Sequence, residues 1–286
     1  MKTGLVLEGG AMRGLFTAGV IDALLKHDAK FDGLIGVSAG AAFGCNFKSR
    51  QSGRVLRYNL RFCRDWRYAS WRSLWRTGDF FGAEFCYHLL PEKLDPFDAA
   101  EFARNPLEFH VVATDVESGE TVCRRLDTAS AETMEFIRAS SSMPLVSRMV
   151  EVDGRRLLDG ALGDSIPLER FEKLGFGRNV VVLTQPAGYV KRPNRAQWLL
   201  KMVYRDYPEL VAAAAARPER YNAQLEYVRA AEAAGRALVL RPESPLPIGR
   251  ICHDPAAIRE VHRIGFEAAE RRMEEILDFL RRAESQ

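Results

Sequence analysis

Two glycine-rich turns, each lying between a short apolar run and a helical pattern, constrain the fold of this chain more than any other feature. The first apolar run, residues 3–8, ends at the segment 9–14 (GGAMRG), after which apolar residues recur at helical spacing. The second run, residues 33–37, is followed by an Ala- and Gly-rich helical stretch over 38–47. Strand, helix, strand, helix in this order predicts a parallel α/β arrangement.

Later segments extend the same pattern to the end of the chain. Residues 114–120 predict a hairpin turn, because they end in Ser-Gly-Glu between two apolar runs. Further strands are expected at 108–114, 120–125, 149–152, 155–158, 179–184 and 237–240, and helices at 131–139, 167–174, 206–233 and 255–282. We therefore expect a single α/β domain over residues 1–286, with a central, mainly parallel sheet flanked by helices. The motifs lie in a core over 4–185, and 186–286 adds a strand and helices.

The composition is that of a globular chain without a dominant charge. The 286 residues carry a formal charge of +3 and 47% hydrophobic residues, which suffices for a core and gives no general signal for nucleic-acid binding. Five cysteines without a Cys-x-x-Cys pair predict free, mostly buried thiols; no metal or organic cofactor is expected. A strand at the N-terminus predicts no signal peptide, and no apolar run reaches the ~18 residues that span a bilayer. The sequence thus predicts a soluble cytoplasmic protein.

The second turn reads Gly36-Val37-Ser38-Ala39-Gly40, a Gly-x-Ser-x-Gly pattern between a strand and a helix. In such a nucleophile elbow the serine hydroxyl is exposed at the end of the strand. Glycines are needed on both sides because a Cβ there would collide with the neighbouring strand or helix. Ser38 is therefore the candidate nucleophile, with Gly36 and Gly40 as elbow glycines; a structural turn serine is the alternative.

The first turn has the character of an oxyanion hole. Backbone N–H groups at the start of a helix are unpaired and favour negative charge, such as that of a tetrahedral intermediate. Gly10 and Ala11 are the expected donors, Arg13 is expected to brace the loop, and Gly9 and Gly14 allow the tight turn. A dinucleotide fingerprint is disfavoured because Ala11 replaces its second glycine, and a P-loop because Gly-Lys-Ser/Thr is absent.

Asp159, in an Asp-Gly-Ala turn after an apolar strand, is the candidate general base. Its carboxylate is ionised at neutral pH and could accept the proton of the Ser38 hydroxyl. Gly160 supplies the tight turn, although Asp-Gly alone is also a common structural turn. A Ser–His–Asp triad of an α/β-hydrolase follows the chain order Ser, Asp, His, and His253 and His262 both come after Asp159. Neither of them, however, occupies a strand-end loop. We expect all five histidines to be structural or exposed.

Residues 48–76 differ from the rest of the chain in composition. They hold nine basic residues and one acid with interleaved aromatics, and Arg54, Arg57, Arg61 and Arg64 fall at helical spacing. Three interpretations remain open. The segment could pack over the core with a solvated arginine face, or it could be a lid that meets anionic lipid head groups at the inner membrane surface. Nucleic-acid binding is the weakest of the three, and no nucleic-acid partner is expected.

With these three signals in order, the chain resembles the patatin-like phospholipase family, and its bacterial branch in particular. The shared features are the glycine-rich turn near the N-terminus, Gly-x-Ser-x-Gly and Asp-Gly-Ala, together with residues 139–144 (ASSSMP), 112–115 (VATD) and Arg241-Pro242. The resemblance is good over about residues 4–185 and looser beyond. Two departures stand out: the third glycine of the oxyanion turn is Ala11, and Glu8 replaces an aspartate common in plant members.

The resemblance implies a Ser38–Asp159 dyad without histidine, with Gly10 and Ala11 as oxyanion donors braced by Arg13. It implies hydrolysis of acyl esters of lipids through an acyl-enzyme, as in phospholipases, lysophospholipases and esterases, with a lipid as the partner. The alternatives are a catalytically weak member that binds acyl chains or regulates a partner, and a Ser–His–Asp esterase that uses His253 or His262. We also expect Ala11 to have a φ angle that alanine tolerates.

Overall fold

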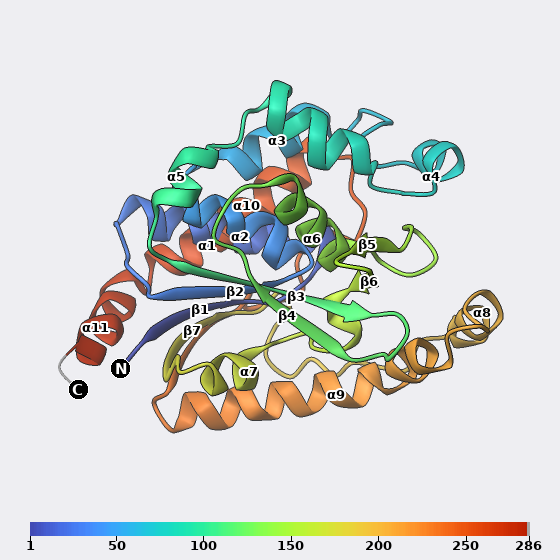
Figure 1. Ribbon diagram of the computed structural model, residues 1–286. Coiled ribbons are helices and arrows are strands. Elements are labelled where there is room, and N and C mark those ends of the chain that lie inside the picture. Colours follow the sequence, from blue (N-terminus) through green and yellow to red (C-terminus); the bar gives the residue numbers. More distant parts are fainter. Residues whose placement is uncertain (285–286) are drawn as a thin grey trace.

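The computed structural model describes residues 1–284, and its centre is an eight-stranded sheet with helices on both faces (Figure 1). The strand order is β5-β6-β3-β2-β1-β7-β8, with β4 paired to β3. The parallel strands are β1 (Thr3–Leu7), β2 (Gly33–Val37), β3 (Glu108–Asp115), β7 (Arg178–Val182) and β8 (Ala237–Leu240). The antiparallel strands are β4 (Thr121–Arg125), β5 (Val150–Val152) and β6 (Arg155–Asp159). The expected mainly parallel α/β sheet is confirmed.

Helices cover the sheet in two layers. In Figure 1 one face carries α1 (Leu15–Lys26), α2 (Ala39–Lys48), α6 (Ala131–Ser141) and α10 (Pro255–Glu270), and the other carries α7 (Leu168–Lys173) and α9 (Pro208–Ala233). The remaining helices are α3 (Arg54–Phe62), α4 (Trp71–Thr77), the π-helix Phe85–Leu94, α5 (Ala99–Arg104), α8 (Gln197–Val203) and α11 (Met273–Glu284), with 3₁₀ turns at Ala11–Gly14 and Gly160–Leu162. Among the described residues, no helix combines the length and apolar character needed to cross a membrane.

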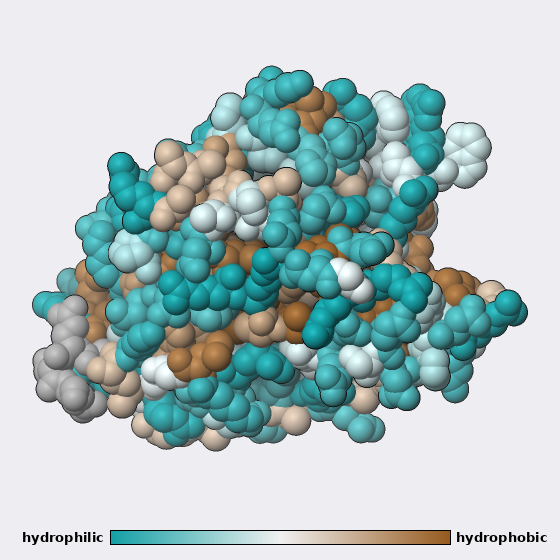
Figure 2. Space-filling view, in the orientation of Figure 1, coloured by the Kyte–Doolittle hydropathy of each residue, from teal (hydrophilic) through white to brown (hydrophobic). Residues whose placement is uncertain are grey.

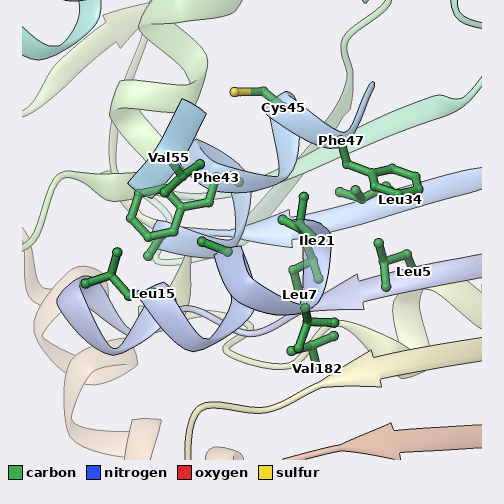
Figure 3. Packing of buried hydrophobic residues seen from close by; sticks show 14 of the residues in the cluster. Leu5, Leu7, Leu15, Ile21, Leu34, Phe43, Cys45, Phe47, Val55 and Val182 are labelled. Atoms are coloured by element: carbon green, nitrogen blue, oxygen red, sulfur yellow. The ribbon is translucent and has the colours of Figure 1, made fainter. Parts of the chain in front are cut away.

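The central strands are buried on both faces, which explains their nearly continuous apolar sequences. Leu5 and Leu7 of β1 point into the cluster that contains α1 and α2, whereas Val6 between them belongs to the cluster on the α9 side. Figure 3 shows Leu5 and Leu7 close to Ile21 of α1 in the first of these clusters. The alternation of side chains along each strand therefore supplies both layers of the core.

Helices α1 and α10 cross at a distance set by two glycines. A Cβ added to Gly19 would lie 2.0 Å from the carbonyl oxygen of His262, and one added to Gly265 would lie 2.0 Å from that of Phe16. Both collisions are with backbone atoms, so a side-chain rotation cannot relieve them. The contact joins the first helix of the chain to the segment after β8, which explains why the C-terminal third packs against the motif-bearing core.

Several sequence-based expectations need correction. The helix expected over 255–282 is two helices, because the chain turns at residues 271–272 between α10 and α11. Helix α8 was not expected. The arginines at helical spacing do not form a uniformly solvated face: Arg54 is only 4% exposed and donates to Asp95 O and Asn46 Oδ1, and Arg57 pairs with the Asp95 carboxylate. The five thiols are free, and two of them, Cys45 and Cys63, are buried.

Replacing Gly19 by Ala should destabilise the protein by about 2 kcal/mol in chemical denaturation. Alanine favours the helix over glycine by about 1 kcal/mol, so helix propensity alone would stabilise the variant. A loss of stability would therefore come from the collision that pushes α1 away from α10. Gly249→Ala is the control, because the nearest atom to its added Cβ lies 3.4 Å away. Equal stabilities for the two variants would contradict the close crossing.

Candidate active site

Ser38 occupies the sharp turn between β2 and α2, at the carboxyl ends of the parallel strands. Its backbone has φ 55° and ψ −123°, a combination that L-residues rarely adopt and that marks a strained position. The elbow glycines permit close packing as predicted: a Cβ on Gly36 would lie 2.7 Å from Ala41 N, and one on Gly40 would lie 2.4 Å from Leu7 O. The positive φ at Ser38 and the close packing of Gly36 and Gly40 agree with a nucleophile elbow.

The side chains of Ser38 and Asp159 meet. Ser38 Oγ donates to Asp159 Oδ2 at 2.9 Å, and the other carboxylate oxygen, Oδ1, accepts from Ala161 N–H at 2.8 Å. Asp159 is the last residue of β6 and Ala161 lies in the 3₁₀ turn that follows. Burial raises the pKa of Asp159, while the nearby Arg217 and the two hydrogen bonds favour the ionised form and oppose that rise. The arrangement leaves Oδ2 facing the hydroxyl whose proton it could accept.

Helix α6 ends in a serine run that fixes both members of this pair. Ser140 Oγ accepts from Ser38 N–H at 2.8 Å and donates to Val112 O of β3 at 2.6 Å. Two residues later, the carbonyl oxygen of Ser142 accepts from Asp159 N–H at 2.8 Å. One short segment therefore hydrogen-bonds to the backbone of Ser38 and of Asp159. Sequence reasoning noted residues 139–144 only as part of a resemblance and gave Ser140 no role.

The glycine-rich loop lies beside Ser38, as expected. A Cβ on Gly9 would be 3.0 Å from Ser38 Cβ. Among the described residues the N–H groups of Gly10 and Ala11 have no hydrogen-bond partner, and both residues line the same cleft as Ser38. The other turn glycines are also crowded. A Cβ on Gly10 would lie 2.9 Å from Thr184 Oγ1, one on Gly14 would lie 2.8 Å from Ala39 Cβ, and one on Gly160 would lie 2.1 Å from Val112 O.

One of the two expectations about this loop is wrong. Ala11 has φ 49°, in the left-handed region that alanine disfavours, rather than an angle that it readily tolerates. Bracing by Arg13, the second expectation, is seen in its backbone N–H, which donates to Gly10 O at 3.1 Å, whereas its buried Nε has no hydrogen-bond partner among the described residues. A further contact ties the start of the loop to distant parts of the chain.

That contact is made by Glu8. Its carboxylate accepts from Thr184 N–H at 2.5 Å and from the Tyr221 hydroxyl at 2.6 Å, which joins β1 to the segment after β7 and to α9. Burial raises the pKa of Glu8, and the hydrogen bonds from Thr184 and Tyr221 oppose that rise. The far side of the loop is tied to the C-terminal third, because Met12 N–H donates to Arg250 O at 3.4 Å.

The histidines take no part in the Ser38–Asp159 contact. His262 Nε2 lies 2.7 Å from Asp22 Oδ2, and His253 Nδ1 lies 2.6 Å from Cys63 O. The other three have glutamate partners: Glu270 for His27, Glu135 for His88 and Glu108 for His110. Each ring is thus engaged away from the dyad, in agreement with the structural role expected.

Two cavities open from Ser38 in different directions. A narrow one of about 120 Å³ runs under the segment between α2 and β3 and is mainly apolar. Its lining includes Phe43, Tyr58, Tyr68, Phe81, Leu90, Met134 and Ile137. A wider cleft of about 790 Å³ opens on the other side, toward the segment after β7 and toward α8 and α9. Ala11, Ser38 and Met143 line both cavities, so the hydroxyl lies at their junction.

The wider cleft contains the residues that sequence reasoning missed. Lys191, Arg217 and Arg250 line it together with Arg13, and all but Arg13 come from the C-terminal third, where no motif was recognised. One signal was present: Arg217 and Tyr221 are four residues apart in a long helical pattern, so both had to share a helix face.

Comparison with known families gives two matches along the chain. Residues 5–171 match the family model described as patatin-like phospholipase, and residues 207–281 match a domain of unknown function, DUF6363. The first match covers more than half of the chain and contains Ser38 and Asp159. The second covers α9, β8, α10 and most of α11, and thus the part that contributes Arg217 and Arg250 to the cleft.

Individual relatives agree with the first match. The chain is 30% identical over 218 residues to the uncharacterized protein YjjU of Escherichia coli, covering 70% of this chain and 56% of that one. It is 28% identical over 213 residues to the NTE family protein Rv1063c of Mycobacterium tuberculosis, covering 71% and 56%. It is also 28% identical over 179 residues to lysophospholipase NTE1 of Debaryomyces hansenii, covering 61% and 11%.

The chain spans about half the length of the first two of these relatives and a small part of the third. Among solved structures, VipD from Legionella pneumophila aligns with 97% of this chain and 67% of its own, at a TM-score of 0.47 and 12% identity.

Ala11→Gly should raise the free energy of unfolding by up to about 1 kcal/mol, because glycine removes the backbone strain at φ 49°. The gain is limited because glycine also increases the conformational entropy of the unfolded chain. Ala18→Gly is the matched control: Ala18 lies inside α1, where the change should cost at least about 1 kcal/mol. If denaturation shows equal losses for the two variants, Ala11 is not strained.

Proposed function

Because this chain belongs to the patatin-like phospholipase family, we propose that it hydrolyses carboxylic esters of lipids through Ser38 and Asp159. The observation that carries this proposal is the 2.9 Å hydrogen bond from Ser38 Oγ to Asp159 Oδ2, next to a loop with two unpaired N–H groups. A nucleophile, a base and an anion-binding loop are the groups that acyl transfer requires.

The proposed reaction has two steps. Ser38 Oγ attacks the ester carbonyl while its proton passes to Asp159 Oδ2, and the oxyanion is bound by the N–H groups of Gly10 and Ala11. The intermediate then collapses, the alcohol leaves with the proton held by Asp159, and an acyl-enzyme remains. Water that gives its proton to the same carboxylate attacks the acyl-enzyme, and the fatty acid leaves as Ser38 takes the proton back.

The two cavities support an orientation for the substrate. An acyl chain fits the narrow apolar cavity, because burial of methylene groups there is favourable and its aromatic walls offer few polar partners. The alcohol part of the ester then faces the wider cleft. The relative named lysophospholipase NTE1 supports a glycerophospholipid or its lyso form as the substrate class.

We also propose that residues 1–286 act as one unit. β8 belongs to the same sheet as β1, and α10 packs against α1 through Gly19 and Gly265. The hydrogen bond from Met12 N–H to Arg250 O links the oxyanion loop to the segment before α10. The region matched as DUF6363 would then complete the substrate site rather than form a separate module.

Contact with an anionic membrane surface is the third part of the proposal. In Figure 1, α4 and α8 both project from the edge toward which the parallel strands point. Trp71 and Trp75 on α4 are 68% and 86% exposed, and Trp198 on α8 is 66% exposed. Figure 2 shows pale and brown atoms over these two projections, next to teal ones.

Tryptophan with flanking cations suits the boundary between lipid headgroups and acyl chains. Arg72 and Arg76 lie over the Trp66 ring on the α4 side, and Lys201 is exposed on α8. A membrane contact was one of three interpretations left open for residues 48–76; we propose it for α4 and also for α8, which lies outside that range.

Asp159→Asn should lower kcat/KM on a soluble p-nitrophenyl ester by about 10³-fold, within the 10²–10⁴ that a general base supplies. Asp153→Asn is the control, since Asp153 is exposed and pairs with Arg124. His253→Ala and His262→Ala should remain active. If a histidine variant loses turnover while Asp159→Asn keeps it, the dyad is wrong.

The wild-type rate should also depend on acid. Burial raises the pKa of Asp159, and only the ionised carboxylate can accept a proton, so activity should fall at a pH above the usual carboxylate range of about 4 as the solution is acidified. A pH–rate profile measures this acid limb, and Asp159→Asn should lack it. If activity falls only at or below a pH of about 4, the pKa of Asp159 is not raised.

The double variants Trp71→Ala/Trp75→Ala and Trp198→Ala/Met202→Ala should each bind phosphatidylglycerol vesicles at least about fivefold more weakly than the wild type, since each loses two interfacial anchors. Co-sedimentation measures this. Leu174→Ala is the control, because Leu174 is an exposed apolar residue after α7. Equal binding by all four proteins would contradict the membrane contact.

A further inference from the structure

We propose that the wider cleft beside Ser38 is a subsite for the phosphate of an anionic headgroup, formed by Arg13, Lys191, Arg217 and Arg250. The inference rests on the proposed function, because it assigns the alcohol part of the ester to this cleft. It goes further because it names the class of lipid ester: the headgroup of the substrate contains a phosphate and no positively charged group.

Among the described residues, the four cations form no direct ion pair. Within the described residues, none of them lies within 4.0 Å of a carboxylate oxygen, although most other arginines in the protein form ion pairs. The Nε atoms of Arg13 and Arg217 are buried with no hydrogen-bond partner. Lys191 Nζ lies 4.5 Å from the centre of the Tyr221 ring and makes no hydrogen bond. Buried donors of this kind are costly unless a ligand satisfies them.

The carboxylates nearby are already engaged. Glu8 accepts from Thr184 and Tyr221, and Asp159 accepts from Ser38 and Ala161. The cations also repel one another: burial, followed by the charges of Arg217 and Arg250, lowers the pKa of Lys191 to about 7, although the charge of Glu8 opposes this shift. Two more arginines, Arg192 and Arg195, lie on the rim of the cleft and add to its positive potential. A bound dianion would reverse this repulsion.

Contacts of the fold position the segments that carry Lys191, Arg217 and Arg250 around the cleft. Arg217 and Tyr221 share one face of α9, and the Tyr221 hydroxyl is fixed by Glu8. The loop with Lys191 is pinned to the same helix, because Lys191 N–H donates to Asn222 Oδ1 at 2.8 Å and Asn222 Nδ2 donates to Lys191 O at 3.1 Å. Arg250 is anchored through its carbonyl to the oxyanion loop.

Phosphate is the anion that this arrangement suits best. Guanidinium groups donate several hydrogen bonds in a plane and match phosphate oxygens, and three of the four cations are arginines. In a glycerol ester the phosphate lies a few bonds from the acyl carbonyl, so Ser38 at the junction of the two cavities can attack the carbonyl while the phosphate lies in the cleft. A choline or ethanolamine group would bring a cation into a cationic cleft.

The test compares substrates that share one short acyl chain: 1-acylglycerol 3-phosphate, the matching lysophosphatidylcholine and the matching monoacylglycerol. For the wild type, kcat/KM should be at least about tenfold higher for the phosphate monoester than for either of the others. Arg217→Gln, and separately Lys191→Gln/Arg250→Gln, should lower that ratio at least about tenfold, equivalent to about 1.4 kcal/mol. Arg217→Lys should recover part of it.

Ratios are compared because Arg217 also lowers the pKa of Asp159, so its replacement changes the rate on every ester. Arg259→Gln is the charge-matched control, since Arg259 is an exposed residue of α10 that does not line the cleft. Thermal unfolding of each variant identifies any loss of fold. A wild-type ratio near one, or variants with the wild-type ratio, would overturn the inference.

A ligand-binding measurement on inactive variants tests this inference independently of the proposed function. sn-Glycerol 3-phosphate should raise the thermal midpoint of Ser38→Ala and should raise it less in Ser38→Ala/Arg217→Gln. This shift is expected even if no ester is hydrolysed, an outcome that would count against the proposed function alone. If inorganic phosphate inhibits turnover of a neutral ester but phosphate esters are not preferred as substrates, the cleft binds a free anion and the headgroup assignment is wrong.

Discussion

The hydrogen bond between Ser38 and Asp159 is the contact on which the rest of this structure depends. The two residues are 121 positions apart: Ser38 directly follows β2 and Asp159 ends β6, and these strands lie on opposite sides of β3 in the sheet. Their meeting requires the strained backbone of Ser38 and the serine run at the end of α6. Ser140 links Ser38 to β3, and Ser142 accepts from Asp159 N–H. Strain of this kind persists only where surrounding contacts enforce it.

The two sides of Ser38 are built by different parts of the chain. The apolar cavity is covered by the segment between α2 and β3, where buried Arg54 and the ion pair of Arg57 with Asp95 hold the excursion together. The cationic cleft is built by the loop after β7, by α9 and by the segment before α10. Ser38 thus lies between two walls that come from different parts of the chain, and the proposed headgroup selectivity depends on the second of them.

The sequence predicted the elements whose signals are local. Short apolar runs between glycine turns predicted all eight strands, and the Gly-x-Ser-x-Gly and Asp-Gly-Ala turns predicted the approach of Ser38 to Asp159. Features set by tertiary contacts were missed. Helix α8 has only seven residues, too few for a periodic pattern, and Arg54 shares its helical spacing with solvated arginines although it is buried. The four cations of the cleft come from four separate segments, so no sequence window contains them together.

Ala11 and Glu8 illustrate the same limit within the site. The sequence showed that Ala11 stands where the family pattern has a glycine, but it did not show that Ala11 keeps the left-handed angle, or that Glu8 ties the start of the loop to Thr184 and Tyr221. The identity of that brace was not predictable because Tyr221 lies 213 positions from Glu8. Local chemistry thus located the loop, whereas distant contacts decided its conformation.

The most direct test of the central claim is peptide mapping by mass spectrometry after reaction with an alkyl fluorophosphonate. An activated serine attacks the phosphorus and becomes covalently modified, whereas an ordinary hydroxyl does not. We expect a single adduct on Ser38 that is lost when Asp159 is replaced by Asn. An unmodified Ser38, or an adduct on Ser140 or Ser142 instead, would contradict the account.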